Sequence, residues 1–286
     1  MEDAKSAKRP VLRVTGHSRE WLDDDVAVEG ALEIRVEGRP LSVTLRTPGN
    51  DRELALGFLA AEGLIRSRAD VAGVSERRAE CGDQPDTLEI TLAPGVPLDW
   101  SRFERHFAAS SACGLCGRAH LESLRAGLSR VTQAALPDPS GLVALPDRVR
   151  ATQSAFLATG GLHAAALCEG DALEVSVLRE DVGRHNAVDK IAGWLIEAGR
   201  YPIERGVLWV SGRAGAEIVL KAARAGIPVL AAVGAPSTLA VELAEAAGLT
   251  LIGFLREGRM NVYSGAREWG VHGASRDVRQ VPPERR

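Results

Sequence analysis

The second half of the chain alternates short apolar runs with stretches of helical spacing, and this alternation constrains the fold more than any other feature. Three of the runs are predicted strands: 207–210, 228–233 and 249–255. Two predicted helices lie between them, over 214–225 and 237–247. Strands that are apolar throughout and separated by helices form a parallel sheet with helices packed against it, so the predicted fold class is α/β.

The first half of the chain predicts an α+β arrangement instead. Residues 26–47 have the pattern of two strands joined by a turn, 87–92 that of a further strand, and a helix capped by Asn50 or Asp51 is expected between them. The prolines in 134–150 predict a linker. We therefore expect four segments: a disordered tail over 1–20, an N-terminal subdomain over 21–140, an α/β subdomain over 141–268, and a C-terminal tail over 269–286.

Composition excludes several classes of protein. Hydrophobic residues make up 45% of the 286 residues and charged residues 26%, which is the balance of a globular chain with a buried core. A net charge of −3 gives no electrostatic case for binding nucleic acid or an anionic membrane. No uncharged run predicts a membrane span, and the polar opening of the chain predicts no export signal. We therefore expect a cytoplasmic protein.

The four cysteines are too few for a disulfide framework, and two of them form a Cys-x-x-Cys pair at Cys113 and Cys116. The surrounding sequence, Ser-Ser-Ala-Cys-Gly-Leu-Cys-Gly, places both thiols in a glycine-rich loop before a stretch of helical spacing. A helix N-terminus favours the thiolate, which is the nucleophilic form. Such a pair can exchange disulfides, bind zinc, hold an iron–sulfur cluster or carry sulfur as a persulfide.

Counting and spacing separate these uses. An iron–sulfur cluster usually takes four cysteines in a recognisable spacing, and Cys81 and Cys168 stand alone. A thioredoxin-type pair follows the first strand of its domain, whereas this pair lies far into the chain. A zinc deaminase needs His-x-Glu and then Pro-Cys-x-x-Cys, but Ala112 precedes Cys113, and the motif at His163 lacks the glutamate and comes after the cysteines. A zinc site completed by distant ligands stays open.

Charged residues gather at the predicted starts of helices. The stretch 180–190 holds six ionisable groups, which are Glu180, Asp181, Arg184, His185, Asp189 and Lys190. Its Gly183-Arg184 pair, at a predicted helix start, is suited to bind an anion. Gly212-Arg213 repeats the arrangement after the next strand, and two such junctions favour a phosphate-bearing ligand. The alternative is an ordinary solvated helix start.

Two further positions have both a structural and a functional interpretation. His163 follows Gly160-Gly161 and opens a predicted strand of small residues. It is either a core histidine or a site residue that assists proton or sulfur transfer. Arg256 and Arg259 flank a glycine turn after the third strand, where they either clamp a diphosphate or lie on a solvated hairpin tip.

Four motifs, taken in order, resemble one known family. They are Ser-Ala-Cys-Gly-Leu-Cys-Gly from residue 111, Thr-Gly-Gly-Leu-His-Ala-Ala-Ala from 159, Glu-Asp-Val-Gly-Arg-His-Asn-Ala-Val-Asp-Lys from 180 and Gly-Phe-Leu-Arg-Glu-Gly-Arg-Met-Asn-Val-Tyr from 253. Together they make the chain similar, from about residue 25 to 265, to the FdhD family, the formate dehydrogenase accessory sulfurtransferases.

The resemblance implies a homodimer with a cytidine-deaminase-like fold and a smaller N-terminal subdomain. It implies a sulfur carrier, which takes persulfide sulfur from a cysteine desulfurase and passes it to the molybdenum cofactor, bis-molybdopterin guanine dinucleotide, for formate dehydrogenase. The family's persulfide cysteine falls on Cys113, and Cys116 matches an auxiliary cysteine. The cofactor-binding segment falls on Phe254, Leu255, Arg256, Glu257, Gly258 and Arg259. No intrinsic metal is expected.

A hypothesis from another class is a non-catalytic chaperone that binds the cofactor and apo-formate dehydrogenase. It predicts that both cysteines can be lost while Arg256 and Arg259 cannot. A third hypothesis is a structural zinc site at Cys113 and Cys116, for which purified protein should contain stoichiometric zinc.

Overall fold

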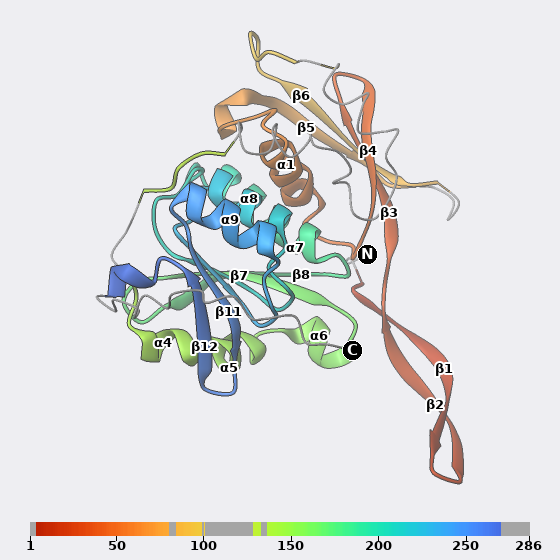
Figure 1. The fold of residues 1–286 in the computed structure, drawn as a ribbon. Helices are drawn as coiled ribbons and strands as arrows, with labels where there is room; N and C mark the ends of the chain where they lie inside the picture. The colour runs from red at the N-terminus through yellow and green to blue at the C-terminus, as the bar shows by residue number, and fades with distance from the viewer. Residues whose placement is uncertain (1–3, 80–83, 99, 101–127, 133–135, 270–286) are drawn as a thin grey trace, which may run out of the picture.

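The computed structural model describes residues 4–79, 84–98, 100, 128–132 and 136–269 of the chain. These residues form a six-stranded sheet, a four-stranded sheet and a two-stranded hairpin (Figure 1). The two larger sheets lie one above the other in this view, and the hairpin stands away from both. The mixed α/β class predicted from the sequence is confirmed.

The six-stranded sheet has the strand order β12-β11-β10-β9-β7-β8. Its strands are β7 (His163–Glu169), β8 (Glu174–Asp181), β9 (Val207–Val210), β10 (Val229–Ala232), β11 (Thr250–Arg256) and β12 (Arg259–Ser264). Strands β9, β10 and β11 run parallel, which confirms the predicted parallel arrangement. Strands β12, β7 and β8 extend the sheet on its two sides as antiparallel neighbours.

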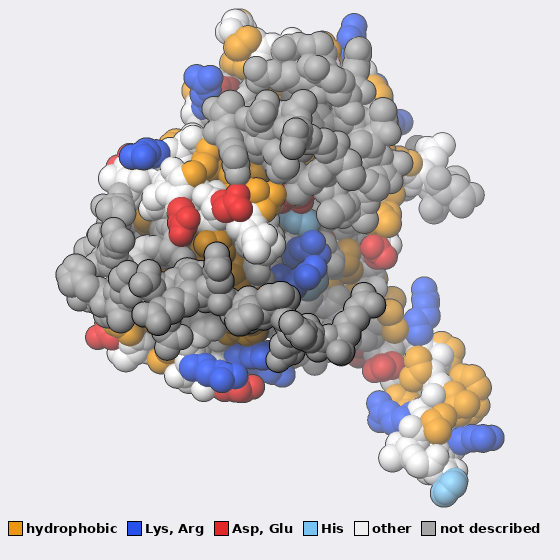
Figure 2. Space-filling model, in the orientation of Figure 1, with side chains coloured by type: hydrophobic (Ala, Val, Ile, Leu, Met, Phe, Trp, Pro, Cys, Tyr) orange, Lys and Arg blue, Asp and Glu red, His pale blue; other side chains and the backbone are white. Residues whose placement is uncertain are grey.

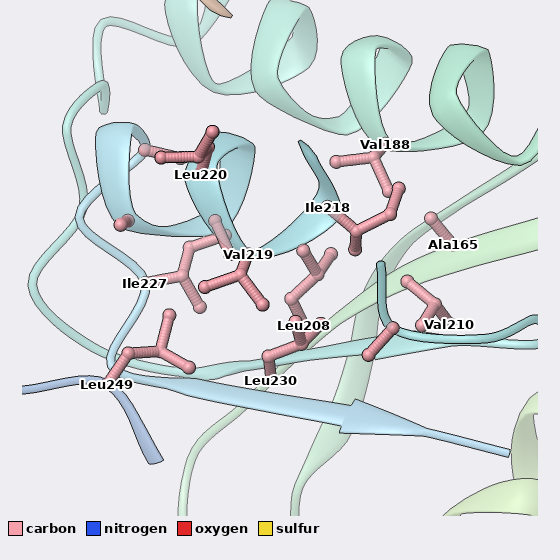
Figure 3. Close-up of a cluster of buried hydrophobic side chains, with 14 of the residues drawn as sticks. Ala165, Val188, Leu208, Val210, Ile218, Val219, Leu220, Ile227, Leu230 and Leu249 are labelled. Carbon is pink, nitrogen blue, oxygen red and sulfur yellow. The ribbon is translucent and has the colours of Figure 1, made fainter. Parts of the chain in front are cut away.

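One face of this sheet is covered by α7 (Arg184–Glu197), α8 (Ala216–Arg224) and α9 (Thr238–Ala247). Ser237 begins α9 as expected, because its Oγ accepts a hydrogen bond from the N–H of Ala240 at 3.2 Å. In the core beneath these helices, Leu208 and Leu230 of the sheet lie close to Val219 of α8 (Figure 3). Alternate residues of the same strands therefore reach the opposite face.

The opposite face is covered by α4 (Pro139–Val143) and α5 (Leu145–Arg150). Leu142, Leu145 and Val149 are fully buried there, in one core with Trp209. The prediction of a linker over 134–150 is therefore wrong for these two helices. Prolines are compatible with a helix at its first positions, where the missing N–H has no intrahelical partner, and both helices have a proline there.

The four-stranded sheet has the order β4-β3-β6-β5 and packs against α1 (Asp51–Ala61). Its strands are β3 (Gly30–Val36), β4 (Arg39–Arg46), β5 (Val71–Arg77) and β6 (Asp86–Leu92). The predicted hairpin, helix and further strand are confirmed. Asn50 precedes α1 at the N-cap position, but its side chain makes no capping hydrogen bond, so the predicted cap is wrong. Two short 3-10 helices, η1 (Arg68–Asp70) and η2 (Ala266–Trp269), complete the described elements.

The two larger sheets are joined where α1 crosses α7 at backbone distance. A Cβ placed on Gly57 of α1 would lie 1.8 Å from the carbonyl oxygen of Asp189, and one on Gly193 of α7 would lie 1.8 Å from that of Glu53. No side chain fits at either position. Glycine within a helix costs about 1 kcal/mol of stability relative to alanine. The close packing of the two helices therefore explains why both positions hold glycine.

Replacing Gly193 with alanine should therefore destabilise the protein by about 1–3 kcal/mol or more, because the two helices must separate. Gly141→Ala is the matched control: it also lies in a helix, and its Cβ would make an ordinary 3.5 Å contact with Leu173. Urea denaturation followed by circular dichroism measures both changes. Equal stability of the two variants would contradict the crossing.

The hairpin consists of β1 (Ser6–Thr15) and β2 (Ser18–Ala27), paired in antiparallel register over their whole length. We call it the arm. The prediction of a disordered tail over 1–20 is wrong for residues 6–20, which lie in this hairpin. Its charged residues pair across the two strands, as Lys8 and Asp25 do at 3.5 Å, so a polar sequence here is compatible with regular structure.

Candidate functional site

Four segments that are far apart in the sequence meet at the carboxyl edge of the parallel strands. The N–H of Ser211 donates to the carbonyl of Ala164 at 3.0 Å, so the end of β9 lies against the start of β7. The N–H of Gly234 donates to the carbonyl of Gly212 at 2.9 Å, and the N–H of Phe254 donates to that of Gly234 at 3.1 Å. The residues predicted to follow each strand are therefore side by side.

Two glycines at this edge have close neighbours. A Cβ on Gly234 would lie 3.0 Å from the Cα of Arg213. One on Gly212 would lie 3.5 Å from Nδ1 of His163 and 3.7 Å from Cδ of Arg184. Arg184 belongs to the first predicted glycine–arginine junction and Gly212 to the second. The two junctions therefore form one site, with His163 between the strands that carry them.

The side chains around this edge are mainly basic. Arg184 and His185, the first residues of α7, are partly exposed, and Arg213 is exposed. Figure 2 shows Lys and Arg side chains beside a histidine at the centre of the displayed face. His185 Nε2 lies 3.0 Å from the carboxylate of Glu217, and this hydrogen bond lowers the pKa of Glu217. Sequence reasoning misses Glu217, because an acidic residue in a first helical turn needs no special role.

Buried Asp181 organises the turn that opens α7. Its carboxylate lies 2.7 Å from Nζ of Lys190, which also donates to the carbonyl of Thr47 at 3.0 Å. It accepts further hydrogen bonds from the N–H groups of Gly183 and Thr47, at 2.9 and 3.2 Å, and from Nδ2 of Asn186 at 3.0 Å. Because Thr47 follows β4, this network fixes the start of α7 against the four-stranded sheet.

The six ionisable groups of 180–190 therefore divide by role. Glu180 accepts hydrogen bonds from two N–H groups at the start of α6 (Ser154–Thr159). Asp189 is buried and lies 2.6 Å from Nζ of Lys221 in α8. These groups, like the Asp181–Lys190 pair, stabilise the fold. Arg184 and His185, the first two residues of α7, are the ones that face the strand edge or the solvent beside it.

The segment Phe254–Arg259 forms the end of β11 and the turn into β12. Phe254 has a φ of 51°, unusual for an aromatic residue, beside an irregular pairing between Gly253 and Arg256. The guanidinium of Arg256 lies 5.8 Å from the centre of the Phe254 ring. Leu255 is fully buried in the core on the other face, so only its backbone can reach a ligand at this edge.

The tip of this hairpin is solvated and carries two arginines. Arg256 and Arg259 are paired across the strands, and Glu257 and Gly258 form the turn between them with positive φ angles. Glu257 lies 3.7 Å from Arg259, with both side chains largely exposed, and such a pair contributes little to stability. The predicted hairpin tip is confirmed, and its arginines are accessible to a ligand.

The cysteine pair at Cys113 and Cys116 lies outside the described residues, as does Cys81. The roles predicted for the pair therefore stay predictions. Cys168 lies within β7, where it is fully buried, and burial raises the pKa of its thiol to about 12. A thiol in that state is unreactive, because the thiolate is the nucleophile.

His163 is the titratable group closest to Gly212. Its pKa is lowered from 6.5, first by burial and then by the charges of Arg184 and His185. The unfolded chain therefore takes up this proton at higher pH than the folded chain does, so the neutral imidazole favours folding at neutral pH. This contribution should be lost as the pH falls below 6.5.

A titration of His163 by NMR should show a midpoint below 6.5. Arg184→Gln should move the midpoint upward, because it removes a positive charge beside the ring. Arg77→Gln on β5 is the matched control and should leave it unchanged. A midpoint that does not respond to Arg184→Gln would contradict the placement of these two residues.

Among the described residues, no group of three or more His, Cys, Asp or Glu side chains is arranged to hold a metal ion. A zinc site that uses Cys113 and Cys116 is not tested by this finding, because the pair is outside those residues. No helix in the described part of the chain has the length and apolar character needed to cross a membrane.

Comparison with known proteins identifies the family. The model of the FdhD/NarQ family matches residues 27–269. The sulfur carrier protein FdhD of Mycolicibacterium paratuberculosis is 47% identical over 272 residues, which cover 93% of this chain and 99% of the relative. That of Streptomyces coelicolor is 47% identical over 266 residues, covering 91% and 94%.

The fold is also found in a solved structure. A putative formate dehydrogenase accessory protein from Desulfotalea psychrophila superposes with a TM-score of 0.72 and 23% identity. The likeness covers 93% of this chain and 99% of that one, so both larger sheets belong to a known architecture. With the family match over residues 27–269 and these relatives, the chain belongs to the FdhD/NarQ family.

Proposed function

We propose that this chain is a sulfur carrier that serves formate dehydrogenase. It accepts persulfide sulfur from a cysteine desulfurase on Cys113 and passes it to the molybdenum cofactor, bis-molybdopterin guanine dinucleotide. The names of the relatives support sulfur carriage, and the order of the four motifs supports the remaining steps. The structural observation that carries the proposal is the basic site that the described residues form at the carboxyl edge of the parallel strands.

The residues of this edge fit a ligand with two diphosphate groups. Arg184 and Arg213 supply guanidinium groups beside Gly212, and Arg256 and Arg259 supply a second pair at the hairpin tip. Guanidinium groups bind phosphate oxygens through two parallel hydrogen bonds, so arginine is the suitable donor at both places. We infer that these four arginines hold the cofactor, which as substrate provides the metal centre that receives sulfur.

The first sulfur step needs no outside oxidant or reductant. The thiolate of Cys113 attacks the outer sulfur of the donor's cysteine persulfide. A new S–S bond forms at Cys113 while the S–S bond of the donor breaks, and the donor cysteine leaves as a thiolate. Cys116, three residues further on, is the auxiliary thiol of this exchange.

The proposal includes the assembly and location of the protein. We expect a homodimer in the cytoplasm, with a cysteine desulfurase and formate dehydrogenase as its protein partners. A reducing compartment suits this chemistry, because a free thiol stays available there for persulfide exchange.

Mass spectrometry after incubation with a cysteine desulfurase and cysteine tests the proposal. The peptide that contains Cys113 should gain about 32 Da, the mass of one sulfur atom, and reduction should remove it. The peptide that contains Cys168 is an internal control and should stay unmodified, because its thiol is buried with a raised pKa. An unmodified Cys113 peptide, or equal loading of a Cys113→Ala variant, would contradict the persulfide mechanism.

A further inference from the structure

The arm exposes more large apolar side chains than any other part of the described chain. Four of the exposed large hydrophobic residues lie on it: Leu12, Val14, Trp21 and Val26. Trp21 is 71% exposed. Figure 2 shows hydrophobic side chains at the surface of the projecting hairpin, and Figure 1 shows the hairpin directed away from the rest of the molecule. Large apolar side chains that are exposed together on one element indicate an interaction site.

The register of the arm places apolar residues on both of its faces. Leu12 lies opposite Trp21, so these two side chains share one face, and Val11 lies opposite Leu22 on the other. A hairpin that lay on a single body, or that was solvated on one side, would need only one apolar face. Isolated two-stranded hairpins are also marginally stable in water. These features are typical of a hairpin whose two faces are both covered by a partner.

The two edges of the arm are unsuited to pairing with a further strand. Pro10 in β1 has no N–H to donate, and β2 carries three consecutive aspartates at 23–25. Prolines and charged residues on an edge oppose strand addition. Contact with a partner is therefore made by the side chains on the faces of the arm.

The same chain also carries a matching apolar surface. Val43 and Leu45 of β4 are 57% and 58% exposed, and they lie on the face of the four-stranded sheet opposite to α1. We call them the β4 patch. The arm leaves this patch uncovered within its own chain, since both side chains are more than half exposed. Apart from Leu157 on α6, the arm and the β4 patch hold every exposed large hydrophobic residue among the described ones.

We propose that the arm of one copy packs on the β4 patch of a second copy, in a two-fold dimer in which each chain gives one arm and receives one. An isologous dimer needs both halves of its contact on one chain, and this chain has them. Specific interfaces usually bury about 1,200–2,000 Å² in total. In a two-fold dimer, the contact between arm and patch occurs twice, and both contacts contribute to this area. This inference rests on the homodimer of the proposed function and assigns its surface.

Sedimentation velocity on the full chain, on an arm variant and on a β4-patch variant tests the assignment. The arm variant is Leu12→Ser with Trp21→Ser, and the patch variant is Val43→Ser with Leu45→Ser. All four side chains are exposed, so both variants should fold, which circular dichroism verifies. The wild-type chain should sediment as a dimer. Each variant should raise the dissociation constant of the dimer at least about 30-fold, the usual effect of losing a residue that dominates an interface.

Mixing provides the sharper measurement. The arm variant keeps an intact patch and the patch variant keeps an intact arm, so a mixture should form heterodimers with one complete contact. Leu157→Ser, which also removes an exposed large hydrophobic residue, is the matched control and should leave dimerisation unchanged. A monomeric wild type, variants that dimerise like it, or a mixture without heterodimers would each overturn the assignment.

Persulfide loading of the same samples separates this inference from the proposed function. A monomer that gains one sulfur on Cys113 overturns the arm contact and leaves sulfur carriage intact. A dimer that depends on the arm but accepts no sulfur supports the contact and contradicts the carrier mechanism.

Discussion

Lys190→Met should lower the free energy of unfolding by about 3–5 kcal/mol, the usual cost of removing one partner from a buried ion pair. The substitution keeps the volume of the side chain but leaves the carboxylate of Asp181 buried without its counter-charge. It also removes the hydrogen bond to the carbonyl of Thr47. Chemical denaturation, with the slope compared between variants, measures the change.

Arg52→Met is the matched control for this prediction. Arg52 of α1 pairs with Glu197 of α7, so it too joins the elements on either side of the helix crossing, but both side chains are about a third exposed. Exposed pairs contribute about 0–1 kcal/mol. If the two variants lose the same stability, the network around Asp181 is not the main polar link between the sheets.

Cys113→Ala should abolish the activation of formate dehydrogenase in a host that lacks its own accessory protein. No other group in the proposed mechanism accepts the sulfur of the donor, so the activity should fall to the background of the host. Cys168→Ala removes a thiol of the same chain that is buried in β7, and it should retain full activation. Formate oxidation by extracts, at matched levels of each variant, gives the result.

The same assay decides between the carrier and the chaperone. If the Cys113→Ala and Cys116→Ala double variant still activates the enzyme while Arg256→Gln with Arg259→Gln does not, the protein acts as a cofactor-binding chaperone. If the cysteine variants are inactive and still bind the cofactor, sulfur transfer is the missing step. Cofactor retained after gel filtration is the second measurement.

The strand–helix pattern of the second half could be predicted because burial imposes it. Strand β9 packs on both faces, so every one of its four residues is buried and apolar. The arm could not be predicted in the same way, since its two faces both carry apolar residues among charged ones and no single face alternates cleanly. The helices α4 and α5 could not be predicted because prolines usually indicate a linker, whereas here they occupy the first turn of each helix.

The site could be predicted as a location but not as a set of roles. Parallel topology brings Gly212, Gly234 and Phe254 to one edge, so the strand ends found in the sequence do lie side by side. The division of the charged stretch depends on Thr47, which lies more than a hundred residues earlier in the chain. No local pattern reveals that Asp181 and Lys190 are directed toward that residue and away from the carboxyl edge of the parallel strands.

The backbone contact between α1 and α7 has a mechanical consequence. Gly57 and Gly193 each face a carbonyl oxygen of the other helix, so α1 and α7 can pack closely in only one register. If one helix shifted along the other by one residue, a side chain would clash with the backbone of its neighbour. The joint between the two sheets therefore cannot serve as a hinge. If the proposed cofactor needs an opening to enter, that opening would lie elsewhere, and the two sheets would keep their relative positions.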